Sequence, residues 1–115
     1  MTMDDDVLAY VAGITATHRP LFDRFHGLVA GTFPEAATVM SYRMPTYRVG
    51  DRRLYVGVWR HGLSLYGWDA ERNADFVRAH PGWVTSKGTI RLTAARLAEL
   101  SDDDLVALIR NALAP

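Results

Sequence analysis

The stretch 54-LYVGVWRHGLSLYGW-68 determines the fold that we predict for this chain. Its first half places Leu54, Val56 and Val58 at every second position, and its second half does the same with Leu63 and Leu65. A period of two is typical of strands that bury one face. The Arg-His-Gly sequence between the halves predicts a hairpin turn. The stretch therefore indicates an antiparallel sheet with one aliphatic face.

Further strands are expected on both sides of this hairpin. The segments 38–43 and 47–49 precede it, and Gly50 and Asp51 supply the turn that leads into it. The segment 89–92 follows a Ser-Lys-Gly turn and carries the sequence Thr-Ile-Arg-Leu. These segments extend the predicted sheet beyond a single hairpin.

Helical spacing of apolar residues surrounds the strands. A short helix is predicted to follow the acids at 4–6 and to end near Gly13, and a longer one runs from Thr17 to about Gly31. Two more are predicted, from 69 to about 80 and from Ser101 onward. This order predicts an α+β fold in which helices pack on one face of an antiparallel sheet, as one domain over residues 1–115.

Strand parity divides the side chains between two faces. The aliphatic residues must face the helices, and the opposite face of such a sheet normally meets water. A large exposed aromatic patch tends to mark a ligand, partner or dimer surface. The alternative is that a loop or part of a helix covers these rings as a second small core. Parity assigns the following residues to this second face: Tyr55, Trp59, Ser64, Tyr66, Trp68, Thr89 and Arg91.

Charge is balanced overall but is unevenly distributed along the chain. The formal net charge is zero, yet the segment from Arg43 to Arg91 carries +5 and the two flanks together carry −5. Twelve of the thirteen cationic residues are arginine, whose planar guanidinium suits contact with carboxylates and phosphates. The middle of the chain is therefore expected to form a basic surface.

Several function classes have no support in the sequence. The chain has no cysteine and no catalytic motif, and Ser-Lys-Gly-Thr at 86–89 lacks the upstream glycine of a phosphate loop. Aromatics and arginines on an open sheet are typical of single-stranded RNA platforms, but nucleic acid stays only a minor alternative, because the RNP signature is missing and the net charge is zero. No apolar run is long enough for a membrane span, and the N-terminus is acidic where a signal peptide would be basic. We therefore expect a cytoplasmic protein that is not an enzyme.

Three ordered motifs carry a resemblance to a known family. The segments YRMPTYRVGDRRL (42–54), RHGLSLY (60–66) and TSKGTIRL (85–92) resemble the bacterial YdhG-like family of unknown function, which is grouped in a superfamily with frataxin. The resemblance covers nearly the whole chain and implies a two-layer α+β sandwich of the frataxin-like kind. It also raises an iron-chaperone function, because at least one relative has been linked to iron delivery. The motif positions that it suggests for ligand binding are Tyr42, Met44, Pro45, Tyr47, Arg60, His61, Tyr66, Lys87, Thr89 and Arg91, and Thr46 and Gly88 complete the motifs.

The local residues give little support to iron, the one cofactor that the resemblance raises. Hard iron prefers oxygen ligands, but the long helix offers only Asp23, between Arg19 and Arg24. The acid runs at 4–6 and 102–104 are better explained as helix N-terminal residues. The four histidines also lack the i, i+4 pairing of a zinc helix; they are His18, His26, His61 and His80. No metal ligand is predicted from the residues themselves.

The sequence favours a non-enzymatic binding domain for a small anionic or aromatic ligand. Arg60, His61, Lys87 and Arg91 are expected to converge near the motif tyrosines in a basic, aromatic pocket. Arg60 stands where the family commonly has lysine, so the charge is retained. Two alternatives stay open: an iron chaperone, and a homodimer whose aromatic faces pair. The chain is accordingly expected to be a monomer or a homodimer.

Overall fold

A six-stranded sheet forms one layer of the molecule in the computed structural model, which describes residues 2–115. The elements in chain order are β1 (Thr2–Met3), α1 (Asp5–Ala12), α2 (Arg19–Thr32), β2 (Ala37–Ser41), β3 (Met44–Val49), β4 (Arg52–Trp59), β5 (Gly62–Tyr66), α3 (Ala74–Ala79), β6 (Ile90–Thr93), α4 (Ala94–Glu99) and α5 (Asp102–Leu113). The strands lie side by side in chain order. The pairs from β2 to β6 are antiparallel, and only the short β1 runs parallel to its neighbour β2.

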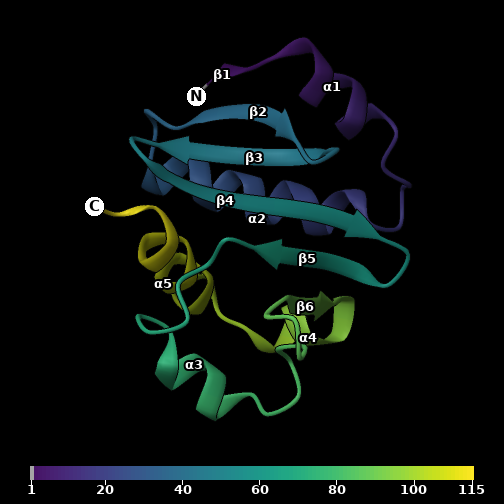
Figure 1. Cartoon of the computed structure of the whole chain (residues 1–115). Helices are drawn as coiled ribbons and strands as arrows, with labels where there is room; N and C mark the ends of the chain where they lie inside the picture. Colours follow the sequence, from purple (N-terminus) through teal and green to yellow (C-terminus); the bar gives the residue numbers. More distant parts are fainter. Residues whose placement is uncertain (1) are drawn as a thin grey trace.

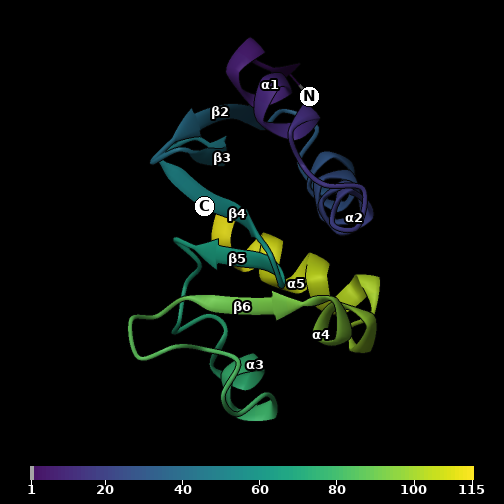
Figure 2. The ribbon, with the colours of Figure 1, turned by 90° about the vertical axis from the view of Figure 1, so that its right-hand side faces the viewer.

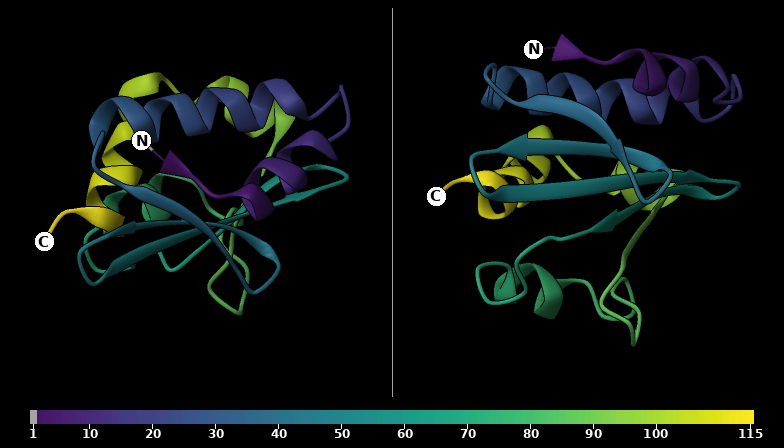
Figure 3. Two further views of the ribbon diagram at one scale, coloured as in Figure 1. Left: turned by 90° about the horizontal axis from the view of Figure 1, so that it is seen from above. Right: turned by 45° about the horizontal axis from the view of Figure 1, so that its top comes forward.

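The long helices lie on one face of this sheet. Figure 1 views the sheet with α2 behind it, and Figure 2 shows α1, α2, α4 and α5 on the same side of the strands. Seen from above, α2 and α5 form a layer over the strands (Figure 3). The short α3 lies beyond the β6 edge. The predicted α+β fold with helices on one face is confirmed.

The core lies between the helices and the aliphatic face of the sheet. The register aligns Val56 with Leu65 and Val58 with Leu63, so their side chains share the inner face. Each fully buried side chain of this size contributes roughly 2 kcal/mol. The largest buried side chains are Tyr47, Phe22, Phe25, Leu54, Leu63, Leu65, Ile90, Leu92, Leu97, Leu105, Leu108 and Ile109.

The acid runs begin helices, as predicted. Asp4 caps α1 by accepting a hydrogen bond from the Val7 N–H at 3.0 Å. Ser101 and Asp104 form a capping box at the start of α5, with both hydrogen bonds at 3.1 Å. A side chain that accepts a first-turn N–H stabilises a helix by about 1 kcal/mol. Both runs therefore have a structural role.

Some segments differ from the prediction. The helix predicted from residue 69 begins only at α3, because the Asp69 carboxylate accepts the Arg72 N–H and holds a turn. The helix α4 was not predicted, since it buries only Leu97 and so lacks an apolar stripe. Trp68, predicted for the exposed face, packs against the core instead, because Gly67 (φ +77°) turns the chain there. Within residues 2–115, no helix has both the length and the apolar composition of a membrane span.

Candidate functional site

The face of the sheet that points away from the helices is called here the open face. The register pairs Thr46 with Tyr55 and Tyr55 with Tyr66, and it places Ser64 opposite Arg91. These side chains therefore share the open face, as strand parity predicted. Figure 1 views the sheet from this side, where no helix crosses the strands. Of the rings that parity assigned to this face, Tyr66 is exposed, whereas Tyr55 and Trp59 are half-buried.

Three tyrosines and a methionine gather at the centre of the open face. The Tyr42 ring meets the edge of Tyr55 with centroids 5.8 Å apart. Gly57 lies beneath two of them, since a Cβ there would be in ordinary contact with the Tyr66 ring at 3.7 Å and with the Met44 sulfur at 3.8 Å. Tyr42 is 79% exposed and Tyr66 38% exposed. The cluster is thus packed at its base and open to solvent above.

The turn that holds Tyr42 has an unusual backbone. Tyr42 and Arg43 form the two-residue loop between β2 and β3 with φ of 50° and 62°. Such a turn favours Asn-Gly, because both central residues are left-handed. A bulky residue there costs roughly 1–2 kcal/mol. Strain of this kind gathers at functional sites, so the turn marks the end of the open face as a candidate site.

Cationic groups surround Trp59 at the other end of the face. The Arg91 guanidinium carbon lies 4.8 Å from the centre of the Trp59 ring, and the His61 ring meets the indole edge-on at 4.8 Å. Arg60 Nε donates to His61 Nε2 at 3.1 Å. Trp59 Nε1 is buried and has no hydrogen-bond partner among residues 2–115. These four residues are called the Trp59 corner.

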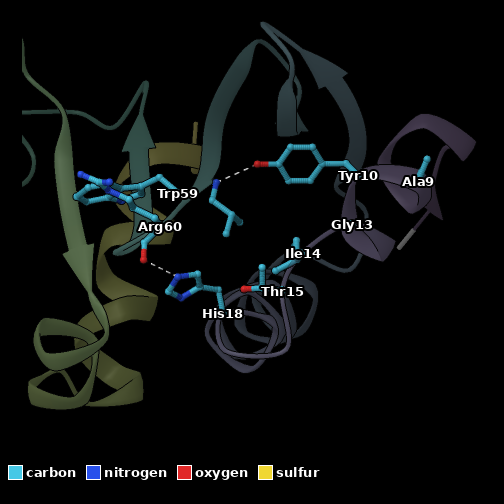
Figure 4. Close-up of a pocket in the computed structure, with 9 residues that line it drawn as sticks. Ala9, Tyr10, Gly13, Ile14, Thr15, His18, Trp59 and Arg60 are labelled. Atoms are coloured by element: carbon cyan, nitrogen blue, oxygen red, sulfur yellow. Dashed lines mark hydrogen bonds between the residues drawn. The ribbon is translucent and has the colours of Figure 1, made fainter.

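A groove of about 510 Å³ lies beside the Trp59 corner, between the α1–α2 connection and the end of β4 (Figure 4). It exists because β4 continues to Trp59, whereas the β3–β4 register ends at the pair Thr46 and Tyr55. We call it the corner groove. Its lining residues are Ala9, Tyr10, Gly13, Ile14, Thr15, His18, Val58, Trp59 and Arg60.

Two side chains satisfy the backbone of the projecting strand. The Val58 N–H donates to the Tyr10 hydroxyl at 2.9 Å, and His18 Nε2 lies 2.7 Å from the Arg60 carbonyl oxygen. A carbonyl only accepts, so His18 Nε2 carries the proton in this contact. His18 Nδ1 is then left as a buried nitrogen without a partner in the described chain. Two residues that line the corner groove thus contain a buried nitrogen without a partner among residues 2–115, His18 Nδ1 and Trp59 Nε1.

The predicted site residues fall into three sets. Arg60, His61 and Arg91 meet at the Trp59 corner, and Tyr42, Met44 and Tyr66 form the neighbouring aromatic cluster. Lys87 does not join them, because Ile90 pairs with Leu65 and this places the 85–89 turn beyond the Tyr66 end of β5. That turn is held by Trp68 Nε1, which donates to the Gly88 carbonyl at 2.8 Å. Two further predicted positions, Pro45 and Tyr47, are buried on the inner face, and Thr89 is 8% exposed.

Tyr47 instead forms a polar pair inside the core. Its hydroxyl lies 3.0 Å from His26 Nδ1, and the His26 ring stacks on Phe22 with centroids 5.7 Å apart. Burial holds the pKa of Tyr47 far above its ordinary value, so the hydroxyl is the donor. Desolvation lowers the pKa of His26 below 6.5, against the opposing charge of Asp23. The pair is a structural element of the core.

Sequence reasoning missed the helical side of the corner groove. Tyr10, Ile14 and His18 come from α1 and the α1–α2 connection, some forty residues before the strand that they contact. Their spacing is that of ordinary helix and loop residues. They become part of a site only because β4 extends past its last residue paired with β3. No sequence signal predicts where that pairing ends.

Comparison with known proteins identifies no relative. No protein-family model matches the chain, and neither a curated protein nor a solved structure matches it significantly. Among residues 2–115, no three His, Asp or Glu side chains gather in a way that could hold a metal ion. The YdhG-like resemblance stays a prediction based on three motifs.

Proposed function

We propose that this protein is a non-enzymatic binding domain that takes a small aromatic anion at the Trp59 corner and in the corner groove. One observation carries the proposal: Trp59 borders the groove, and its ring, which points away from the groove (Figure 4), contacts Arg91 and His61. An apolar groove and a group of cations therefore meet at one residue. A ligand with a ring and a carboxylate or phosphate would use both parts.

The corner groove suits the ring of such a ligand. Its volume of about 510 Å³ falls within the usual range for small-molecule sites. Ile14 and Val58 supply apolar wall, and His18 also lines the groove, with its Nδ1 buried. Sites of this kind use apolar burial for affinity and a few polar atoms for orientation.

The cations suit the anionic group. Arg60 and Arg91 take part in none of the ion pairs formed among residues 2–115. Clustered cations repel one another, and a bound anion would relieve that repulsion while forming charge-assisted hydrogen bonds. Asp23, the one acid of α2, is already paired with Arg19 at 2.9 Å, which argues for an anion site over an iron-binding ridge.

Thermal unfolding with sodium benzoate tests this function. We expect benzoate to raise the melting temperature above that in sodium chloride at the same ionic strength, because chloride reproduces only the screening. Benzyl alcohol, which has the ring without the charge, should raise it less. The double variant Arg60→Ala, Arg91→Ala should lose most of the increment. Lys87→Ala removes one cation at the far end of β5 and should keep it.

A benzoate increment that equals the chloride increment would contradict the proposed function. The same conclusion would follow if the double variant retained the full increment. Blocking the groove with Ile14→Trp separates the two parts of the site. If Ile14→Trp binds benzoate as well as the wild type does, the cations alone hold the carboxylate. The groove would then have no role in binding.

A further inference from the structure

The open face carries arginines that form no ion pair with an acid of residues 2–115. Arg48 and Arg53 are direct cross-strand partners on this face, and like charges in that position destabilise a sheet. No Asp or Glu occurs in any strand from β2 to β6. The nearest acid in sequence, Asp51, lies in the β3–β4 turn and forms no ion pair with either arginine. An arrangement of this kind favours an anionic partner.

Four acids of the described chain form ion pairs away from the open face. The ion pairs of residues 2–115 involve α2, α3, α5, the turn at Asp69 and Arg52 at the start of β4, and none includes an open-face arginine. The zero net charge therefore conceals a one-sided distribution. The pairs are Arg19 with Asp23, Arg24 with Asp102, Arg52 and Arg72 with Asp69, and Arg78 with Asp75.

Exposed rings lie between two groups of cations on this face. Tyr42 and Tyr66 stand above Tyr55 and Gly57 at the centre. Arg48 and Arg53 lie toward one end of β4, and Arg91 lies over Trp59 at the other. From residue 53 to residue 59 a strand extends about 20 Å. A single small anion cannot reach both groups, whereas a strand of roughly four nucleotides can.

The chemistry of the face matches an unpaired polynucleotide. Unstacked bases stack on tyrosine rings, and arginines contact the phosphates between them. Tyr42 and Arg43 are adjacent in one strained turn and both are exposed, so the turn carries one group that can stack on a base and one that can bind a phosphate. A duplex keeps its base faces covered and could not use the rings.

A second copy of this chain suits the face less well. In a two-fold dimer, each end of the open face contacts either the same end or the opposite end of the open face of the second copy. Both ends carry arginine and the strands carry no acid, so either arrangement places cation against cation. The sequence expectation against nucleic acid depended on net charge and on a signature that belongs to a different sheet fold. Net charge is a poor guide here, because the acids and the open-face arginines lie in different parts of the molecule. The RNP signature does not apply to this sheet.

We propose that the open face binds single-stranded nucleic acid, with bases stacked on Tyr42 and Tyr66 and phosphates held by Arg43, Arg48 and Arg53. Fluorescence anisotropy with labelled oligothymidylate and oligouridylate of about ten nucleotides tests this. Tyr42→Asn is the first variant, because asparagine tolerates the left-handed backbone and the fold is kept. Removing the ring should weaken binding by about fivefold or more.

The phosphate contacts have a separate readout. Each contact with a single strand contributes about 0.7 to the slope of log K against log salt, so Arg48→Ala with Arg53→Ala should lower that slope by about 1.4. The matched control replaces Arg78 and Arg110, two exposed arginines on α3 and α5, with alanine. The control removes the same charge away from the open face, and the slope should not change.

Three outcomes would overturn this proposal. One is the absence of saturable binding at low salt. Another is binding of a duplex of the same length with the same affinity as the single strand, together with an affinity for the single strand that Tyr42→Asn does not change. The third is a dimer in sedimentation that Tyr42→Asn dissociates, which would assign the open face to self-association. The variants used here leave the Trp59 corner and the corner groove intact, so their benzoate increment should equal that of the wild type, and this separates failure of the open face from failure of the Trp59 corner.

Discussion

The two faces of one sheet are built on opposite principles. The inner face is aliphatic, almost fully buried and closed by α2 and α5. The open face carries tyrosines, a tryptophan and arginines whose charge no acid of the strands balances. Because side chains alternate along a strand, adjacent residues belong to different faces. Neighbouring substitutions should therefore have unlike effects, and this contrast can be tested residue by residue.

The largest difference is expected between Leu65 and Tyr66. Leu65 is fully buried and Tyr66 is 38% exposed. Leu65→Ala should cost about 3 kcal/mol in unfolding free energy, because it removes buried methyl groups and leaves a cavity. Tyr66→Ala should cost less than about 1 kcal/mol. Urea unfolding of both variants measures this, and equal losses would show that the open face is also a core.

A smaller loss is expected from the polar pair within the inner face. Tyr47→Phe keeps the ring and removes the hydroxyl that donates to His26 Nδ1. The variant should be less stable by about 1–2 kcal/mol, since one hydrogen bond is lost and a half-buried acceptor is left unpaired. Unfolding in urea again gives the value. A stability equal to that of the wild type would mean that water replaces the hydroxyl without cost.

A gain is expected at the strained turn of the open face. Tyr42→Asn should stabilise the protein by about 1 kcal/mol, because asparagine adopts φ > 0 at lower cost than tyrosine does. Tyr55→Phe is a suitable control, since it alters the neighbouring ring without changing the turn. A loss of stability in Tyr42→Asn would show that the ring contact with Tyr55 outweighs the backbone strain.

The core should also respond to pH. Burial lowers the pKa of His26, so the unfolded chain binds a proton more readily than the folded one. The stability due to neutral His26 is complete above pH 6.5 and is lost as pH falls toward the lowered pKa. His26→Gln keeps an acceptor for Tyr47 and cannot titrate, so its stability should fall less between pH 6.5 and pH 5. If the stability of His26→Gln and that of the wild type fall equally with pH, groups other than His26 cause the pH dependence.

The sequence predicted the faces better than it predicted the site. The alternation of Leu54 and Val56 gave the hairpin and the open face, because period and register depend on local chemistry. The convergence of Arg60 and Arg91 followed from the same pairing. The corner groove depends on how far β4 extends past its pairing with β3 and on how α1 packs against the end of β4. Tertiary packing determines both. Lys87 was misplaced because the length of the turn before β6 was not known.

The central claim is that the Trp59 corner binds an aromatic anion, and the indole N–H signals test it most directly. Trp59 Nε1 has no partner among the described residues, whereas Trp68 Nε1 donates to the Gly88 carbonyl. In a two-dimensional proton–nitrogen spectrum with signals assigned by Trp→Phe variants, benzoate should move the Trp59 signal progressively to saturation and leave the Trp68 signal in place. A Trp59 signal that does not move, or one that moves together with that of Trp68, would contradict the account.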